Sequence, residues 1–285
     1  MVAIDSDKQF NFAESYFKAG EYFKAIIEYE RFNYFFPDDE RVELALYRIG
    51  MSYFKSRHFK KAINAFTTLI NRDGYTDLSI LSIQSYLMIS DCHIGLNETV
   101  PAIINLHNLA ALTDDLNVKD EVYYRAGWIY LEEGSWEKAR LYFKKISIPN
   151  KNKYQLKKLA VELDQEKYIV KKNPTVAGFL SIIPGAGNLY CERYQDALIA
   201  FLLNAGLMWA AYESFDEDHE VLGGLITFVE VGFYAGNIYG ATTSAHKYNQ
   251  TKTRQFIEKL KENTKVNLSA GYKSEGILLS LRYVF

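Results

Sequence analysis

The chain has 285 residues, a formal net charge of −2 and a pI of about 6.3. This balance excludes nucleic acid as the main partner, because binding to it requires a strong basic footprint. Aromatic residues make up 15 % of the chain and only 5 residues are proline, which is typical of helices packed through large side chains and far from a disordered composition. The two cysteines, Cys92 and Cys191, form no spaced pair, so they specify neither a disulfide framework nor a zinc site.

The first residues do not read as a signal peptide. Asp5-Ser6-Asp7 is a helix-start signal, and helical periodicity follows at once. We therefore expect either a protein made without an export signal or a mature form from which a leader has been removed.

Residues 8–148 contain an internal repeat. Equivalent alanines stand at Ala25, Ala62, Ala102 and Ala139, at intervals of 37, 40 and 37 residues. Around them, small and aromatic residues occupy the offsets of a tetratricopeptide repeat, whose usual period is about 34 residues. The sequence predicts four helical hairpins with slightly long connecting turns, of which the third is degenerate. An ordinary helical bundle with accidental spacing is the alternative.

Small residues within each predicted hairpin let two antiparallel helices approach closely, and Gly20 and Gly134 end the first helix with positive φ at little steric cost. A single hairpin cannot bury its apolar face alone, so stacked neighbours form a continuous core. The first helices then line a concave groove, and we predict that it binds a protein or peptide partner. The groove tyrosines are Tyr16, Tyr47, Tyr53, Tyr124 and Tyr130.

The stretch from Lys151 to Val170 reads as one amphipathic helix. We expect it to cap the open face of the last hairpin, as the ends of a solenoid require, and to lead to the next domain.

The composition changes at Asn173-Pro174, where an apolar module over residues 173–248 begins. Its first stretch, 175–190, is interrupted by Pro184-Gly185-Ala186-Gly187 and fits a broken or re-entrant element. A spanning helix needs about 20 apolar residues; the stretch 197–212 is marginal, whereas 221–245 is long enough and contains no Lys or Arg. We predict that the module is associated with a membrane, and a buried soluble helical hairpin is the alternative.

Three glycines of the last apolar stretch, Gly232, Gly236 and Gly240, recur at four-residue spacing. They line one face of the predicted helix with small residues. In a membrane such a face packs closely against another helix, so it predicts contact with membrane lipid on the remaining faces and a homo-oligomer through this one.

Glu230 lies in the same stretch, where a carboxylate is costly and should face a partner or a cavity. Tyr234 and Asn237 follow on the same helical face, and Asn204 could approach from the preceding helix. Two interpretations stay open: a protonatable or substrate-sensing site, and a hydrogen-bonded tie between helices.

The chain is predicted to end in a short charged helix, 251–265, and a β-hairpin. Residues 266–272 and 276–285 read as strands joined by Lys273-Ser274-Glu275. An isolated hairpin is only marginally stable, so we expect it to pack on the helical body or to extend a partner's sheet.

The segment from Pro174 to Tyr190 resembles the P-G-x-G-(Q/N)-x-Y signature of small bacterial membrane modules, in which paired apolar helices follow. Pro184, Gly185, Gly187 and Tyr190 carry the match, whereas Cys191-Glu192 replaces the usual small residue and glycine. The whole chain is similar to bacterial tetratricopeptide-repeat proteins with this module at the C-terminus. The resemblance implies architecture rather than activity. Because a secretory leader usually precedes such repeats, it also implies a cell-envelope protein with periplasmic repeats.

Charge gives the opposite indication of sidedness. Lysines and arginines flank the apolar module on both sides, and the loop 215–220 inside it is acidic. The positive-inside bias places both flanks in the cytoplasm. Long domains can translocate regardless of charge, however, so the resemblance slightly favours periplasmic repeats.

No Walker loop, Rossmann fingerprint, nucleophile elbow or H-E-x-x-H motif is present, and the five histidines are scattered. The sequence therefore predicts no enzyme, no cofactor and no metal site.

These patterns predict a mainly α-helical chain. A TPR-like solenoid covers residues 1–150, a capping or linker helix 151–172, the apolar module 173–248, and a charged helix with a β-hairpin 249–285. The predicted function is a membrane-tethered scaffold that binds its partner through the groove. The alternatives are a small transporter or channel-like subunit, with Glu230 as its functional carboxylate and the repeats as a regulatory domain, and a soluble enzyme accessory protein.

Overall fold

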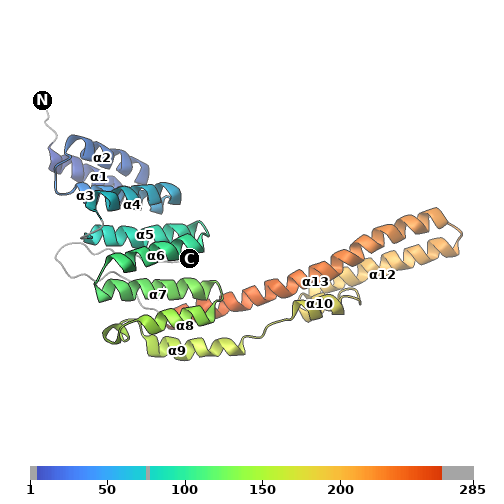
Figure 1. Cartoon of the computed structure of the whole chain (residues 1–285). Helices are drawn as coiled ribbons and strands as arrows, with labels where there is room; N and C mark the ends of the chain where they lie inside the picture. The colour runs from blue at the N-terminus through green and yellow to red at the C-terminus, as the bar shows by residue number, and fades with distance from the viewer. Residues whose placement is uncertain (1–4, 75–77, 265–285) are drawn as a thin grey trace. The chain divides into compact units, whose positions relative to one another are not determined.

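The computed structural model describes residues 5–74 and 78–264, and the chain divides into two compact units, Met1–Leu156 and Lys157–Phe285. Helices dominate the described part of both units (Figure 1). The predicted strands at 266–272 and 276–285 lie outside the described residues.

The described part of the first unit is a stack of four antiparallel helical hairpins (Figure 1). The second helix of each hairpin contacts the first helix of the next. The predicted four-hairpin solenoid is thus confirmed. Its helices are α1 (Ser6–Lys18), α2 (Tyr22–Phe35), α3 (Val42–Lys55), α4 (Phe59–Asp73), α5 (Ile80–Gly95), α6 (Thr99–Leu112), α7 (Leu116–Glu132) and α8 (Trp136–Lys145).

Every hairpin turns through one residue with a left-handed backbone. Gly20 and Gly134 have φ of 78° and 73°, as predicted, and the equivalent positions are Arg57, with φ of 61°, and Asn97, with φ of 59°. A non-glycine residue is uncommon in this conformation. The turn geometry is therefore shared by all four hairpins, although only two of them use glycine.

The two helices of a hairpin approach closely because small residues face large ones. Ala25, the anchor of the first repeat, is fully buried, and so are its three equivalents. A Cβ atom added to Gly50 would lie 2.5 Å from the ring of Phe66, and one added to Gly127 would collide with the ring of Phe143 in the same way. The small residues found by sequence spacing are therefore the points of closest approach.

The predicted helix over residues 151–170 is wrong in its extent. A 3₁₀ turn, η1, covers Ile148–Asn150, α9 covers only Leu156–Leu163, and the 3₁₀ helix η2 covers Asp164–Tyr168. Tyr154 is the physical reason, because its ring is fully buried and stacks on Tyr124 with ring centres 4.5 Å apart. This contact holds the preceding residues in a turn and covers the end of the fourth hairpin.

After α9 and η2, the described part of the second unit contains two short helices followed by a long antiparallel helical hairpin (Figure 1). The short helices are α10 (Pro174–Leu180) and α11 (Ala186–Tyr190), and the long ones are α12 (Tyr194–Asp216) and α13 (Glu220–Asn263). The interruption predicted at Pro184-Gly185-Ala186-Gly187 is present but begins earlier: it covers 181–185, Gly185 has φ of 82°, and Ala186 and Gly187 already belong to α11. The separate helix predicted at 251–265 is wrong: no Gly or Pro occurs from 241 to 263, so α13 continues without interruption.

Candidate functional site

Three of the five predicted groove tyrosines repeat one contact along the array. In each case a lysine of the second helix lies over the ring of a tyrosine of the first helix: Lys24 over Tyr16 at 5.3 Å, Lys61 over Tyr53 at 5.7 Å and Lys138 over Tyr130 at 5.2 Å. The rings are half-buried and the lysines are exposed. We call these the Tyr–Lys pairs. They present equivalent ammonium groups from the first, second and fourth hairpins.

The other two groove tyrosines belong to the core. Tyr47 and Tyr124 are each only 2 % exposed. Tyr47 packs against Phe66, with ring centres 5.6 Å apart, and Tyr124 lies between Phe143 and Tyr154. Their rings stabilise the hairpins from inside, so a partner at the surface would not contact them.

A further aromatic cluster on the fourth hairpin was not predicted. The Tyr142 ring stacks on His107, and its hydroxyl lies 2.5 Å from His107 Nε2. Tyr123 and Tyr130 flank the same ring, and the Lys145 ammonium lies 4.5 Å from its centre. Partial burial and the positive charge of Lys145 lower the pKa of His107. Its members come from α6, α7 and α8, so sequence spacing within one repeat could not reveal the cluster.

The P-G-x-G-N-x-Y motif holds the broken helix against α13. The N–H of Gly185, which follows Pro184, donates to Asn237 Oδ1 at 3.3 Å, and the Asn237 amide donates to the carbonyl oxygen of Ser181 at 3.1 Å. A Cβ atom on Gly185 would collide with the carbonyl oxygen of Ala197. Asn237 thus pairs the backbone groups that the break leaves without helical partners.

The rest of the motif continues this contact. A Cβ atom on Gly187 would collide with Ser181 Oγ and the Ala177 carbonyl oxygen, so only glycine fits at this approach of α11 to α10. Ser244 Oγ donates to Asn188 Oδ1 at 3.1 Å, and the hydroxyl of Tyr190 accepts from the Asn173 N–H at 3.2 Å. The motif residues therefore have structural roles in the second unit.

The α12–α13 hairpin has small and polar residues inside and large apolar residues outside. Seven of its buried residues fall on heptad spacing, at Ala197, Asn204 and Ala211 in α12 and at Gly223, Glu230, Asn237 and Ser244 in α13. The large apolar side chains on the surface include Leu198, Ile199, Phe201, Leu202, Trp209, Val221, Leu225, Phe228, Val231 and Phe233. This distribution is the reverse of that in the core of a water-soluble protein.

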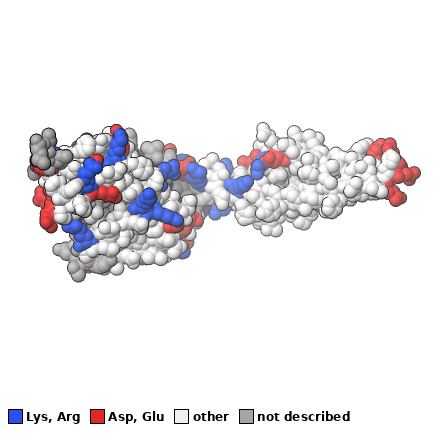
Figure 2. Space-filling model, turned by 90° about the horizontal axis from the view of Figure 1, so that it is seen from above, with Lys and Arg blue, Asp and Glu red and all other residues white. Residues whose placement is uncertain are grey.

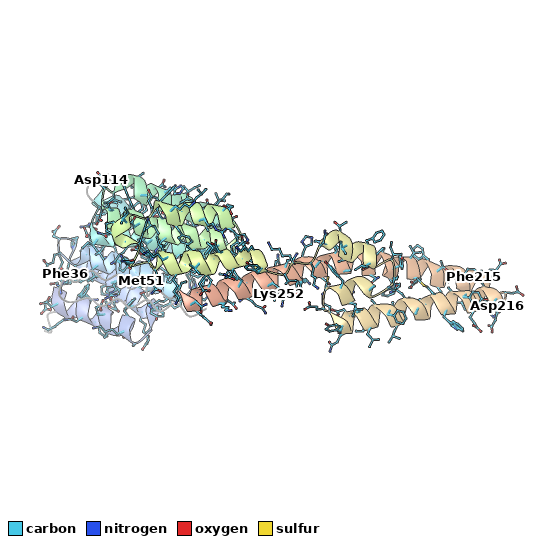
Figure 3. All side chains as sticks on the ribbon, turned by 90° about the horizontal axis from the view of Figure 1, so that it is seen from below. Phe36, Met51, Asp114, Phe215, Asp216 and Lys252 are labelled. Carbon is cyan, nitrogen blue, oxygen red and sulfur yellow. The ribbon has the colours of Figure 1, made fainter. Side chains whose placement is uncertain are left out.

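Apart from the buried Glu230, the charged residues of this hairpin lie near its two ends. In the second unit, the long uncharged surface in Figure 2 separates the acidic tip from a base that carries both signs. Figure 3 places Phe215 and Asp216 at the tip and Lys252 towards the other end of α13. Both α12 and α13 are long and apolar enough to cross a membrane, and only 17 % of the apolar window of each is buried.

Glu230 is one of the buried residues inside the α12–α13 hairpin, and it has no hydrogen-bond partner among the described residues. It is 6 % exposed, and among the described residues neither carboxyl oxygen has a donor. Tyr234 and Asn237 do not donate to its carboxyl group. The Tyr234 hydroxyl donates to the carbonyl oxygen of Ile182 at 2.8 Å, and the Asn237 amide donates to the carbonyl oxygen of Ser181. Asn204 is 2 % exposed and its Oδ1 also has no partner. Neither predicted role of Glu230 is therefore assigned by its contacts.

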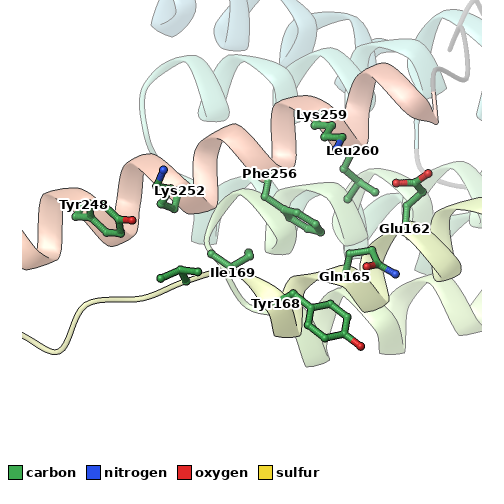
Figure 4. Close-up of a pocket in the computed structure, with 10 residues that line it drawn as sticks. Glu162, Gln165, Tyr168, Ile169, Tyr248, Lys252, Phe256, Lys259 and Leu260 are labelled. Atoms are coloured by element: carbon green, nitrogen blue, oxygen red, sulfur yellow. The ribbon is translucent and has the colours of Figure 1, made fainter. Parts of the chain in front are cut away.

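A cavity of about 380 Å³ lies at the base of the second unit, where α9 and η2 face the end of α13 (Figure 4). Tyr168, Phe256 and Leu260 form its apolar lining, and Lys252 and Lys259 contribute its positive charge. Glu162, also in its wall, accepts from the Asn263 amide at 3.1 Å.

Comparison with known proteins identifies the first unit. A family model described as tetratricopeptide repeat matches residues 44–73 and 121–147, which are the hairpins α3–α4 and α7–α8. The second and fourth hairpins are tetratricopeptide repeats, and the first and third share their helical-hairpin form. Such repeats are protein-interaction scaffolds that present an extended concave surface, and proteins made of them are typically not enzymes.

Solved structures with similarity to the chain include other repeat proteins. A tetratricopeptide repeat protein from Parabacteroides merdae ATCC 43184 is 17 % identical with a TM-score of 0.46, over 90 % of this chain and 99 % of that chain. MamA 41-end from Desulfovibrio magneticus RS-1 is 15 % identical with a TM-score of 0.40, over 50 % and 73 %. The C-terminal part of a TPR repeat-containing protein from Cytophaga hutchinsonii is 14 % identical with a TM-score of 0.38, over 90 % and 96 %.

No curated protein matches the chain significantly. With TM-scores this low, the assignment to tetratricopeptide repeats rests on the family model and on the hairpin geometry. The degenerate third repeat lies outside the matched residues. There His93 and Pro101 stand where the other repeats carry the tyrosine and lysine of a Tyr–Lys pair.

Proposed function

We propose that this protein is a membrane-anchored scaffold whose tetratricopeptide repeats bind a protein segment while α12 and α13 cross the bilayer. The reversed α12–α13 hairpin is the observation that carries the proposal. Burial of a leucine, valine or phenylalanine side chain stabilises a protein by about 1.5–3 kcal/mol relative to exposure to water, and each side chain exposed here would lack that contribution in water. In hydrocarbon the same surface is favourable, and the small and polar seam is where two spanning helices pack.

The dimensions of the hairpin fit a bilayer. The 23 residues of α12 give a helix of about 34 Å, which matches a hydrocarbon core of about 30 Å. The first residues of α13 form the matching antiparallel span, and the rest continues beyond it as a charged helix. Because α10 and α11 are too short to cross, the repeats would lie on the same side of the membrane as the end of α13.

The resemblance favours periplasmic repeats, but the charge distribution supports a cytoplasmic location for that side, and we propose the cytoplasmic one. The tip carries Asp216, Glu217, Asp218 and Glu220 and no lysine or arginine, whereas the base carries Lys171, Lys172, Arg193, Lys247, Lys252 and Arg254. Under the positive-inside bias, the end of the hairpin that carries these lysines and arginines stays in the cytoplasm. A cysteine introduced by Asp218→Cys should react with an impermeant maleimide on intact cells, and one introduced by Asn152→Cys should not. The opposite labelling would place the repeats in the periplasm.

Two matched substitutions test the membrane anchor itself. Val231 is 62 % exposed near the middle of the apolar part of α13, and Val161 is 67 % exposed on α9. Val231→Lys should cost about 2.5–3.5 kcal/mol of insertion free energy and lower the fraction of full-length chain that floats with vesicles, whereas Val161→Lys should not. In a water-soluble hairpin both substitutions would be neutral. Wild-type chain that stays monodisperse in detergent-free buffer would refute the proposal.

The Tyr–Lys pairs are the surface that the proposal assigns to the partner. Three ammonium groups at equivalent repeat positions suit a segment with acidic side chains, since each lysine is exposed and held over a ring. Lys24 also pairs with Glu21, so Lys61 and Lys138 are the main contacts that we assign to such a segment. A photo-crosslinking residue at Tyr53 should capture the same protein as one at Tyr130. A crosslinker at exposed Tyr168, in the second unit, is the control. Equal capture from all three positions would argue against groove recognition.

A transporter or channel-like subunit is the second candidate, and the unpaired carboxyl of Glu230 is the observation that favours it. In that case Glu230→Gln should abolish flux in vesicles that contain the full chain and leave its folding intact. The scaffold proposal expects the same substitution to leave partner capture at Tyr53 unchanged, so the two measurements separate the candidates.

A further inference from the structure

Two lysines converge on one tyrosine ring at the base of the α12–α13 hairpin. The Lys172 ammonium lies 5.3 Å from the centre of the Tyr248 ring, and the Lys252 ammonium lies 5.2 Å from the same centre. The backbone of Lys172 is fixed against α13, because its N–H donates to Asn249 Oδ1 at 2.7 Å and its carbonyl oxygen accepts from the Asn249 amide at 2.8 Å. We call Lys172, Tyr248 and Lys252 the basal cluster.

The basal cluster brings together more positive than negative charge. Glu192 accepts from the Tyr248 hydroxyl at 3.1 Å and lies 3.4 Å from Lys172 Nζ. Lys252 is half-buried and forms no ion pair within the described part of the chain. Because both ammonium groups lie within 5.3 Å of the same ring centre, the two like charges are close enough to repel each other. One carboxylate balances only one of them, so the cluster suits a further anion.

The cavity of about 380 Å³ begins at this cluster (Figure 4). Tyr248 and Lys252 lie in its wall, and Lys259 adds an exposed ammonium group. Glu162, the carboxylate among its described lining residues, binds Asn263, which is 15 residues, or about 22 Å, further along α13 than Tyr248. The end of the cavity next to the ring therefore combines positive charge with space for an anionic group.

The cluster lies level with the start of α12. Arg193, which directly precedes that helix, donates from Nη1 to Ser244 Oγ at 3.0 Å. In the proposed anchor this level is the boundary of the bilayer. Apolar side chains follow on its hydrocarbon side, where Val176 and Phe179 of α10 are 41 % and 73 % exposed. An anionic phospholipid has both matching parts, a phosphate for the lysines and acyl chains for α10, whereas a free phosphate has only the first.

We propose that the basal cluster binds the phosphate group of an anionic phospholipid. The inference rests on the proposed membrane anchor. Lys172 and Lys252 donate to the phosphate oxygens, and the Tyr248 ring holds their ammonium groups in place. The rest of the headgroup occupies the adjoining end of the cavity, and the acyl chains lie against Phe179. Lysines beside a membrane attract anionic lipids in general, so the proposal is tested by its dependence on position rather than on charge alone.

Native mass spectrometry of the full-length chain in detergent measures the binding constant of the first lipid, for phosphatidylglycerol and for phosphatidylcholine. Lys252→Gln removes one ammonium group of the cluster. Lys247→Gln is the matched control, because Lys247 is exposed on the same helix, nearer to its apolar part, and lines neither the cluster nor the cavity. We expect Lys252→Gln to weaken the first phosphatidylglycerol about fivefold, the contribution of one lysine at an anionic membrane surface, and Lys247→Gln to change it little. Equal losses would overturn the site in favour of diffuse attraction.

Substitutions of Tyr248 test the geometry without a change of charge. Tyr248→Leu removes the ring and should weaken the first phosphatidylglycerol at least about twofold, as loss of a cation–π contact does, whereas Tyr248→Phe keeps the ring and should bind as the wild type. Unchanged binding in Tyr248→Leu would overturn the role of the cluster.

Two further outcomes separate the possible ligands and the two proposals. Displacement of phosphatidylglycerol by an equal concentration of inorganic phosphate would overturn a lipid as the ligand. A chain that floats with vesicles but binds phosphatidylglycerol and phosphatidylcholine equally would overturn the lipid site and leave the anchor intact. Exclusion of the chain from the vesicles would overturn the anchor as well.

Discussion

Arg48 donates its Nε–H to Glu14 Oε1 at 2.7 Å, and this ion pair joins the second hairpin to the first. The two side chains are only 10 % and 12 % exposed. Arg125 repeats the arrangement in the fourth hairpin, with its Nη1 3.1 Å from Asp91 of the third. In both cases 34 residues separate the partners. The stack is therefore stabilised at two equivalent interfaces by the same type of partly buried ion pair.

Removing one partner of the first pair should destabilise the repeats. Arg48→Met leaves the Glu14 carboxylate buried without its cation, and breaking a buried pair in this way costs about 3–5 kcal/mol. Lys8→Met is the control, because Lys8 is 66 % exposed and pairs with Asp5, 57 % exposed, at the surface, where a pair contributes little. Urea unfolding of the full-length chain, followed by circular dichroism, measures both. Equal losses would show that the Glu14–Arg48 pair is no more important than a surface contact.

The hairpin fold could be predicted from the sequence because its determinants are local. The alanine and glycine spacings lie within one repeat, and they identify the buried contacts that the structure shows. The left-handed backbone at Arg57 and Asn97 was not predicted, because glycine is the residue that reliably indicates this conformation in a sequence. The Glu14–Arg48 pair was missed because it forms between neighbouring hairpins, whose register depends on the stacking of the whole array.

The candidate site was predicted less completely, because a periodic pattern assigns a residue to a helix face but not to a partner. Tyr47 was expected at the groove with Tyr53, yet its ring is buried against Phe66. Asn237 is buried on the same helix as Glu230, but its amide pairs the broken helix around Gly185. Both outcomes have one origin: the contacts of a side chain in these helices depend on distant segments.

Gly50 should not tolerate even a methyl group. In Gly50→Ala the new Cβ atom lies 2.5 Å from the ring of Phe66, which is fully buried and has no room to withdraw. Overpacking of this kind costs about 1–3 kcal/mol and outweighs the gain in helix propensity of up to about 1 kcal/mol. Thermal unfolding of the full-length chain should show the loss.

The double substitution Gly50→Ala, Phe66→Leu tests the cause. A smaller side chain at 66 makes room for the methyl group, so Gly50→Ala should cost less in that background, with a coupling energy of about 0.5–3 kcal/mol between the two positions. Additive losses would mean that the ring of Phe66 is not what excludes the methyl group.

His107 should make the repeats less stable in mild acid. Its pKa is lowered in the folded chain by partial burial and by Lys145, whereas the unfolded chain should titrate near the ordinary value of about 6.5. Below that value the unfolded state binds more protons, so the stability that neutral His107 contributes is present above about pH 6.5 and is lost as the pH falls through the folded pKa.

The comparison is between the wild type and His107→Gln, which does not titrate. The free energy of unfolding of the wild type should fall more steeply than that of the variant between about pH 7.5 and pH 5.5. Parallel curves would show that protonation of His107 is not opposed by its contacts with Tyr142 and Lys145.

Gly187 should be required for the short helix α11 to reach α10. In Gly187→Ala the added Cβ atom collides with the carbonyl oxygen of Ala177, a backbone atom that cannot rotate away. The displacement of α11 should expose Cys191, which is buried and follows that helix directly.

Cys92 is an internal reference in the same chain, because its thiol is fully buried and burial raises its pKa to about 12. Alkylation of Cys191 by a maleimide, read by peptide mass spectrometry, should therefore accelerate in Gly187→Ala while Cys92 stays protected. In Gly206→Ala, where the methyl group meets open space on α12, both thiols should keep their wild-type rates. If Cys191 stays as protected in Gly187→Ala as in the control, the motif glycine does not determine how closely α11 packs.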